Sequence, residues 1–462
     1  MKSLKRGKNL ITFMMLVFLA GIIMLIVKIQ MEASFYISNS GSRDLGYVYD
    51  CNGDIIFDDE AQEGDYPDGY FKDVGNLIGD ASGQMTNTLV ANNLERLSNY
   101  SFTKGITRKG GKAAIYTTLD HRANERVYSA FGSKNGCAIA YNYKTGEILI
   151  CVSKPNVDPL KGYEDLEEGS LLCKAFYKTV PGSTQKISTL IAAVETMGID
   201  KLSEKSFVCE GSYTNRTGEV INCHNLYGHG TQNITEAFQN SCNPFFAQLV
   251  EDSDWNLSDI EKIYRRLGFS VNGSASGSID INGIISQTAS TELTDKYEFN
   301  TQWSCIGQGM SIVSPCQMMM WQSAIANESG KSTMPYLIDH VTNVNGRTVE
   351  SSSVSYSDQL FSSSTASEVK KIMLENGLNY TGSIPGYNLG IKSGTAQVKN
   401  GEEENSLLTG FVDDESFPIA FAVLIENRQS SDISTDSIVY EILSNLCLLY
   451  TSDAADDLTR VD

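Results

Sequence analysis

The longest apolar stretch of the chain lies close to its N-terminus. Leu10–Val27 comprises eighteen residues without a charge, and Thr12 is the polar side chain among them. At a rise of about 1.5 Å per residue, this stretch forms a helix of about 27 Å, close to the thickness of the hydrocarbon core of a bilayer. We therefore predict a transmembrane signal anchor over residues 9–28, preceded by a short tail over residues 1–8.

A cleaved signal peptide and a buried core helix are the alternatives to an anchor. The apolar part of a signal peptide is usually shorter, and no clear small-residue cleavage site follows Val27. A core helix does not account for the charge step at this point. Residues 1–31 hold five basic and no acidic side chains, whereas the remainder carries a net charge of −25. Basic residues before a membrane helix predict a cytoplasmic N-terminus and an extracytoplasmic remainder, in a single-pass protein of the cell membrane.

Hydrophobic patterning divides the rest of the chain into two units and a tail. Residues 29–128 contain short apolar runs joined by turns, such as Asp50–Gly53 between Gly46–Tyr49 and Ile55–Phe57. They predict a small, β-rich pedestal domain next to the membrane. Longer elements follow and predict a larger domain over residues 129–449. The acidic tail at 450–462 has no periodic apolar face and is predicted to be disordered or non-native.

The larger domain begins and ends with strands and has helices between them. The spacing of Ile187, Leu190, Ile191 and Val194 predicts a helix that ends at Gly198. Further helices are predicted at Ile234–Val250, Pro315–Ile325, Ala366–Glu375 and Ser437–Leu448, and strands at Cys137–Tyr143, Glu147–Val152, Leu389–Val398, Leu407–Val412 and Ile419–Glu426. Strands on both sides of a helical block indicate an α+β fold, with a central antiparallel sheet covered by helices.

Composition and charge exclude several classes of protein. The 462 residues carry a net charge of −20, so phosphate groups are repelled and nucleic-acid binding is excluded. Charged residues at 20% and aromatic residues at 9% are typical of packed proteins rather than disordered chains. Four histidines and the absence of a CxxC pair from the sequence give no support for a metal or other cofactor. Cys209 and Cys223 are the first candidates for a disulfide, whereas Cys137 and Cys151 do not obviously lie opposite each other.

The first chemical pattern is S-x-x-K, formed by Ser183 and Lys186. The two residues lie three positions apart at the start of a predicted helix, and therefore on one face. A serine hydroxyl becomes a good nucleophile when a base removes its proton. A lysine whose pKa is lowered by burial and by the positive end of a helix can be that base. Because such a short pattern also arises by chance, it needs support from elsewhere in the chain.

Two further motifs follow at larger separations. Ser241-Cys242-Asn243 offers a hydroxyl that can relay a proton and an amide that can bind substrate. Lys392–Thr395 lies on a predicted strand, where small residues after the lysine allow an extended peptide to pair along the strand edge. Each motif alone is compatible with ordinary surface, and it is their combination and order that are informative.

In this order the motifs resemble those of the penicillin-recognising serine enzymes. The chain is more specifically similar to class B penicillin-binding proteins, the monofunctional D,D-transpeptidases of peptidoglycan synthesis, over most of residues 43–447. The likeness is carried by KTGEIL at 144–149, YGHG at 227–230, IGQG at 306–309 and KSGTAQ at 392–397, besides the three motifs.

The chain departs from the family pattern in its pedestal. Gly46–Gly53 reads GYVYDCNG, with Leu45 and Cys51 where the family has arginines. The departure concerns salt bridges inside the pedestal and not the catalytic chemistry. Cys242 occupies the variable position of S-x-N and implies no chemistry. His229 lies in a glycine-rich loop without an evident Asp partner and is predicted to have a structural role.

The resemblance implies a β-lactamase/transpeptidase-like fold with a helical subdomain, and a role for each motif residue. It implies that the catalytic residues are Ser183, Lys186, Ser241 and Lys392, and that the substrate-binding residues are Asn243, Ser393, Gly394 and Thr395. The backbone N–H groups of Ser183 and Thr395 are expected to form the oxyanion hole. The resemblance implies neither a cofactor nor a metal.

The implied reaction is the crosslinking of peptidoglycan stem peptides through an acyl-enzyme, with β-lactams acylating the same serine. The expected partners are stem peptides of the lipid-linked precursor and nascent glycan, the cytoplasmic membrane, and a membrane glycan polymerase of the SEDS family. A β-lactamase or β-lactam sensor of the same superfamily and a mainly scaffolding cell-wall protein are the alternatives. Glu251 and Glu261 follow Asn243, without a convincing match to the E-x-x-x-N pattern of class A hydrolases.

Overall fold

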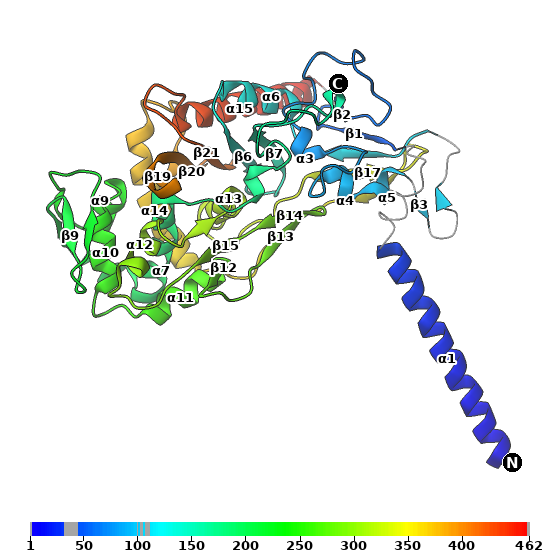
Figure 1. Ribbon diagram of the computed structural model, residues 1–462, viewed down its shortest axis with the longest axis horizontal. Helices are drawn as coiled ribbons and strands as arrows, with labels where there is room; N and C mark the ends of the chain where they lie inside the picture. Colours follow the sequence, from blue (N-terminus) through cyan, green and yellow to red (C-terminus); the bar gives the residue numbers. More distant parts are fainter. Residues whose placement is uncertain (1, 32–44, 99, 102–104, 107–110, 460–462) are drawn as a thin grey trace.

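The computed structural model describes residues 2–31, 45–98, 100–101, 105–106 and 111–459 (Figure 1). Its first element is helix α1 (Lys2–Met31), in which Lys8–Ile29 is long and apolar enough to cross a bilayer and is not buried against the rest of the protein. Within the described ranges, this is the one helix that meets both criteria. The predicted N-terminal apolar helix is thus confirmed.

The larger domain is built on one five-stranded antiparallel sheet. Its central strands are nearly continuous apolar runs, IAFAVLI in β21 and GCAIAYN in β6, as expected for strands with both faces covered. The strand order is β19 (Leu389–Val398), β20 (Glu403–Val412), β21 (Ile419–Ile425), β6 (Gly136–Asn142) and β7 (Ile148–Lys154). All four pairings are antiparallel, so the predicted sheet is confirmed and β19 is one of its edge strands.

Helices cover both faces of this sheet (Figure 1). Alternating side chains of β21 enter two separate apolar clusters, with Phe421 and Val423 in one and Ala420 and Leu424 in the other. The first cluster is completed by α6 (His121–Ala130) and α15 (Thr435–Thr459), and the second by α7 (Lys186–Met197), α13 (Pro315–Ala326) and α14 (Ser363–Gly377). The α+β fold with a helix-covered sheet follows directly from this alternation.

The pedestal sheet crosses the boundary predicted at residues 128 and 129. Its order is β18, β17, β5, β1, β2, with β1 (Tyr47–Tyr49), β2 (Ile55–Phe57) and β5 (Ala114–Thr117) from the predicted pedestal. The hairpin β17 (Ile338–Thr342) and β18 (Thr348–Ser351) comes from the larger domain and pairs antiparallel with β5. Three short strands would leave the edge of β5 open, and the hairpin covers it.

The predicted helix Ile234–Val250 is wrong in one respect, because it is two helices. α9 (Ile234–Gln239) ends before the S-x-N motif, and α10 (Asn243–Glu251) begins within it. Between them Ser241 adopts a left-handed conformation with φ of 49°. Apolar residues continue on both sides of the turn, so the hydrophobic period alone does not reveal the break.

Helix α15 continues to Thr459, through most of the segment predicted to be without regular structure. Extending an existing helix costs much less than nucleating one, and neither Gly nor Pro occurs between residues 435 and 459 to stop it. Residues 460–462 lie outside the described part of the chain.

A buried ion pair joins the start of α6 to the pedestal. His121 Nε2 lies 3.1 Å from Asp73 Oδ1, and Asn124 Nδ2 donates to Asp73 Oδ2 at 2.9 Å. Burial opposes the protonation of His121, but the hydrogen bond and charge of Asp73, with the charge of Asp50, raise the pKa of His121 above 6.5. This pair therefore stabilises the fold fully below the pKa of an unfolded histidine, and its contribution is lost as the pH rises through the folded pKa.

We expect Asp73→Asn to destabilise the protein by about 3 kcal/mol at pH 6, because it leaves a buried imidazolium without its counter-ion. At pH 9 we expect a smaller loss, because the contribution of the pair declines as the pH rises through the folded pKa of His121. Thermal unfolding of the detergent-solubilised full chain at the two pH values measures the difference. Asp54→Asn, which removes the exposed partner of Arg122 on the same helix, is the control and changes stability little at either pH. An equal loss for Asp73→Asn at both pH values would contradict the assignment.

Candidate active site

The S-x-x-K serine lies on a turn that packs directly against the edge strand β19. Ser183 belongs to the 3-10 turn η3 (Gly182–Gln185), which leads into α7. Gly182 has φ of 55°, and a Cβ there would lie 2.6 Å from the carbonyl oxygen of Thr395. A Cβ on Gly394 would similarly lie 3.1 Å from the backbone nitrogen of Ser183. Two glycines thus allow the first and third motifs to touch through their backbones.

Lys186 is fully buried below Ser183 and contacts the first two motifs. Its Nζ lies 2.7 Å from Ser183 Oγ and 2.7 Å from Asn243 Oδ1. The same atom lies 3.0 Å from the carbonyl oxygen of Ser241 and 3.3 Å from its Oγ. Burial, and after it the charge of Lys392, hold the pKa of Lys186 well below its usual 10.5. A neutral amine so close to a hydroxyl can accept its proton.

Ser241 stands between two buried lysines. The left-handed turn directs its Oγ toward Lys186 on one side and toward Lys392 Nζ, 3.1 Å away, on the other. Lys392 also donates to the carbonyl oxygen of Ser393 at 2.9 Å, and burial lowers its pKa to about 7. The four groups Ser183, Lys186, Ser241 and Lys392 therefore form a continuous chain along which a proton can move.

A cavity of about 530 Å³ opens above these groups. Six of the eight residues predicted for the site line it, namely Ser183, Ser241, Asn243, Ser393, Gly394 and Thr395, and the two lysines lie buried beneath them. Because β19 is an edge strand, the cavity is bordered by a backbone that can pair with an extended peptide. The structure thus brings together all eight residues that the sequence placed in one site.

Several residues that line the cavity were not predicted from the sequence. Phe299 and Trp303 stack there with ring centroids 5.3 Å apart, and Asn222, His224 and Glu404 add polar groups. Gln308, from the IGQG segment at 306–309, donates to the carbonyl oxygen of Thr395 at 3.2 Å and so links that segment to β19. The aromatic spacing in FNTQW at 299–303 was the one signal in the sequence that pointed to a wall of this kind.

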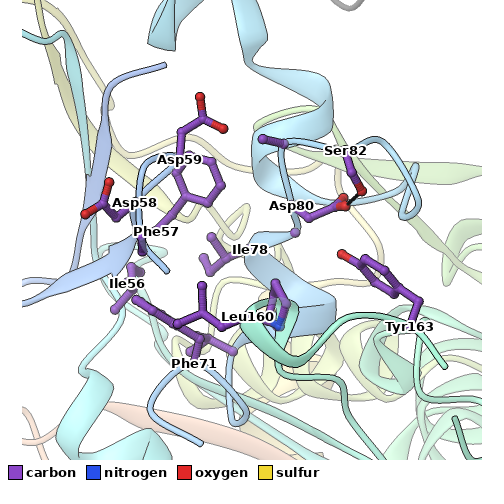
Figure 2. Close-up of a pocket in the computed structure, with 16 residues that line it drawn as sticks. Ile56, Phe57, Asp58, Asp59, Phe71, Ile78, Asp80, Ser82, Leu160 and Tyr163 are labelled. Carbon is purple, nitrogen blue, oxygen red and sulfur yellow. Dashed lines mark hydrogen bonds between the residues drawn. The ribbon is translucent and has the colours of Figure 1, made fainter. Parts of the chain in front are cut away.

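A second hollow, of about 290 Å³, is lined by residues of β2 and α3 (Gly75–Ile78) and by Pro159, Leu160 and Tyr163 of the larger domain (Figure 2). Apolar side chains such as Phe57, Phe71 and Leu160 form its floor, and Asp80 hydrogen-bonds Ser82 at its rim. Its lining includes Asp58, Asp59 and Asp80 but no lysine, so Ser82 has no amine base there. The chemistry that the sequence predicts therefore belongs to the cavity at Ser183.

The sequence is similar to those of known proteins. Residues 136–444 match the family described as penicillin binding protein transpeptidase domain. Stage V sporulation protein D of Bacillus subtilis is 32% identical over 325 residues, which cover 66% of this chain and 48% of that protein. Peptidoglycan D,D-transpeptidase MrdA of Salmonella typhimurium is 24% identical over 379 residues, covering 72% and 58%. The chain thus spans about half the length of these relatives.

Solved structures show the same fold. The D,D-transpeptidase domain of a peptidoglycan glycosyltransferase from Eggerthella lenta superposes with a TM-score of 0.72 at 21% identity, covering 88% of this chain and 99% of that one. Penicillin-binding protein A of Mycobacterium tuberculosis, as its penicillin G acyl-enzyme complex, gives a TM-score of 0.69 at 18% identity, covering 89% and 100%. With the family match extending over more than half of its length, the chain belongs to the penicillin-binding protein transpeptidase family.

Proposed function

We propose that this chain is a class B penicillin-binding protein that acts as a serine D,D-transpeptidase of peptidoglycan, and that β-lactams acylate it. The observation that carries the proposal is the 2.7 Å contact between Lys186 Nζ and Ser183 Oγ at the floor of a cavity bordered by an edge strand. A nucleophile with its base supplies the chemistry, and the strand edge supplies a place for a peptide. The relatives named as D,D-transpeptidases support the choice of reaction.

Acylation is the first step. Ser183 Oγ attacks the carbonyl carbon between the last two D-alanines of a stem peptide, and neutral Lys186 accepts its proton. The backbone N–H groups of Ser183 and Thr395 donate to the oxyanion, an effect of about 10²–10³ in rate for each donor. When the C–N bond breaks, the proton passes from Lys186 through Ser241 to the leaving amine, leaving an ester on Ser183.

Substrate binding uses the residues around this chain of groups. Lys392, Ser393 and Thr395 bind the terminal carboxylate, and Lys392 provides a local positive charge in a chain whose residues 32–462 carry a net charge of −25. Asn243 accepts from Lys186 through Oδ1 and donates through Nδ2 to the carbonyl oxygen of Asn222 at 3.0 Å. The second hydrogen on Nδ2 remains for a carbonyl of the stem peptide.

Deacylation completes the crosslink. An amine from a neighbouring stem attacks the ester carbonyl, a new amide bond forms, and Ser183 regains a proton from the incoming amine through Lys186. A β-lactam follows the first step only, because its opened ring stays attached and blocks the approach of an amine.

A hydrolase of the same superfamily needs a carboxylate that activates water at the ester. Glu251 is committed elsewhere, since it accepts hydrogen bonds from Gln302 at 2.7 Å and from Tyr213 at 2.9 Å and does not line the cavity. Glu404 lines the cavity but lies on β20 opposite Gln397, beyond the third motif. These positions favour a long-lived acyl-enzyme over rapid hydrolysis, and the lifetime of a penicillin adduct distinguishes the two activities.

The anchor and pedestal suggest where the enzyme works. We propose that α1 crosses the cytoplasmic membrane with its basic end inside, so that the catalytic domain faces the lipid-linked precursor and nascent glycan. The apolar span Lys8–Ile29 and the basic residues before it support this orientation. The partner that fits this arrangement is a membrane glycan polymerase of the SEDS family, contacted through the anchor and pedestal.

Replacing the nucleophile tests the proposed function directly. We expect the full chain in detergent to take up fluorescent penicillin covalently and Ser183→Ala to take up none, with the adduct located on Ser183 by peptide mass spectrometry. Ser188→Ala removes a hydroxyl from α7, which follows η3, outside the cavity and keeps the labelling. Equal labelling of wild type and Ser183→Ala would refute the proposal.

The rate of acylation is expected to depend on pH with two limbs. It rises with pH while Lys186 loses its proton and becomes a base, and it falls above about pH 7, where Lys392 loses the charge that binds the carboxylate. Stopped-flow measurement of the second-order rate constant with a penicillin gives the profile.

Lys392→Arg separates the two limbs, because arginine stays charged across the whole range. We expect a lower rate, an unchanged acidic limb, and an alkaline limb displaced upward by at least one pH unit. Lys178→Arg, outside the cavity, is the control and keeps the wild-type profile. An alkaline limb at the same pH in Lys392→Arg would show that Lys392 does not cause it.

A further inference from the structure

Three cysteines and a histidine converge immediately behind the S-x-N motif. Among the described residues, Cys209, Cys223, His229 and Cys242 form one group whose Sγ and imidazole nitrogen atoms all lie within 4.8 Å of one another. The three cysteines are buried, and His229 is half-buried. They come from four separate places: the end of β8 (Phe207–Cys209), the residue after β10 (Val220–Asn222), the residue before β11 (Gly230–Gln232), and the N-cap of α10.

The spacing of these atoms approaches that of a tetrahedral metal site. With bonds of about 2.3 Å to sulfur and about 2.0 Å to nitrogen, tetrahedral zinc places two sulfurs about 3.8 Å apart and a sulfur and a nitrogen about 3.5 Å apart. Cys223 Sγ lies 3.5 Å from His229 Nδ1. The other pairs lie within 4.8 Å, which exceeds these spacings by about 1 Å at most.

We propose that Cys209, Cys223, His229 and Cys242 bind a structural Zn²⁺ ion with tetrahedral Cys₃His coordination. Soft thiolates with one imidazole are the donor set that selects zinc over magnesium or calcium, and four protein ligands are typical of a structural site rather than a catalytic one. None of the four ligands is among the reacting groups, and their binding of zinc does not depend on the proposed function.

The backbone around the group is arranged so that the four ligands meet. A Cβ on Gly228 would lie 2.2 Å from the carbonyl oxygen of Cys209, and one on Gly211 would lie 2.2 Å from that of Leu226. The amide of His229 donates to the carbonyl oxygen of Cys209 at 3.0 Å, and that of Cys223 to Gly211 at 2.9 Å. These close approaches require glycine and bring two loops against β8.

A disulfide accounts for the group less well than a metal does. Any disulfide here would use two of the three cysteines and leave the third, buried thiol and the half-buried imidazole without a role. A zinc ion instead uses all four groups at once, and it suits a set of side-chain atoms that all lie within 4.8 Å of one another.

The position of Cys242 gives the metal a consequence for the proposed reaction. Cys242 lies between Ser241, which relays the proton, and Asn243, which binds the stem peptide, and Cys223 lines the cavity. The left-handed turn at Ser241 is intrinsically unfavourable for a residue other than glycine and needs support from its surroundings. Zinc bound to Cys242 acts as that support, so that Cys242 is a positioning residue and the variable position of the motif is a metal ligand.

The sequence analysis predicted no metal, a possible Cys209–Cys223 disulfide and a structural loop role for His229. The reason for the difference is spacing. The ligands are separated by 14, 6 and 13 positions in the chain, without the CxxC pair that usually indicates zinc. Only the folding of three short strands and a helix start brings the four residues together.

Metal analysis of the full chain tests the site. Protein purified in detergent without chelator is expected to contain about one zinc per chain by inductively coupled plasma mass spectrometry. In Cys209→Ser and Cys223→Ser the zinc content falls at least tenfold. Cys316→Ser makes the same change at a buried cysteine outside the group and keeps the metal.

Cobalt provides a second measurement that needs no variant. After chelation and dialysis, Co²⁺ added to the wild-type chain is expected to bind stoichiometrically, with thiolate-to-cobalt charge-transfer absorption in the near ultraviolet and intense tetrahedral d–d bands. Zn²⁺ then displaces it. Absence of zinc together with absence of these bands overturns the proposal, as does a Cys209–Cys223 disulfide found by mass spectrometry or full zinc content in Cys223→Ser.

Penicillin labelling of Ser183 is scored separately in the same samples. A chain that binds zinc without being acylated would refute the proposed function and keep the metal site. A chain that is acylated without binding zinc would refute the metal site and keep the proposed function. If the metal supports the S-x-N turn, removing it slows acylation at least tenfold, and adding Zn²⁺ restores the rate.

Discussion

Keeping two lysine side chains out of water is the constraint on which the site depends. An exposed lysine is protonated at neutral pH and cannot take a proton from serine, whereas desolvation makes the neutral amine accessible. Lys186 and Lys392 are both buried, with the hydroxyl of Ser241 between them. Because the two lysines are buried close together, the positive charge of Lys392 disfavours a positive charge on Lys186. The pair can thus hold one neutral base and one cation at the same time.

Each layer of the fold contributes to this enclosure. The sheet and the helices on both of its faces bury Lys392 on β19. Gly182 and Gly394 let η3 pack closely against β19, which shields Lys186 from solvent. The turn between α9 and α10 places Ser241 between the two lysines. The left-handed conformation of Ser241 is strained. The neighbouring Cys242 belongs to the group of three cysteines and a histidine, and a metal bound there would stabilise the turn. Stability and chemistry are therefore concentrated at the same turn.

Much of the fold could be predicted from the sequence, because local periodicity and turn chemistry decide it. The limits of β19 and the end of α7 at Gly198 agree with the prediction, and all eight predicted site residues meet at one cavity. The failures share another cause. The helix break at Ser241 leaves the apolar period intact, the hairpin β17–β18 crosses between units, and the ligands Cys209 and His229 are brought together only by the fold.

The sequence by itself determined the family, the order of the motifs, the apolar N-terminal helix and the acidic character of the remaining chain. These properties reside in residue identity and short-range spacing, which need no folding to be seen. Only the tertiary structure decided which groups are desolvated and which distant segments touch, because burial and contact depend on the packing of all layers at once. The same serine, lysines and cysteines in an unfolded chain would have ordinary pKa values and no shared proton or metal.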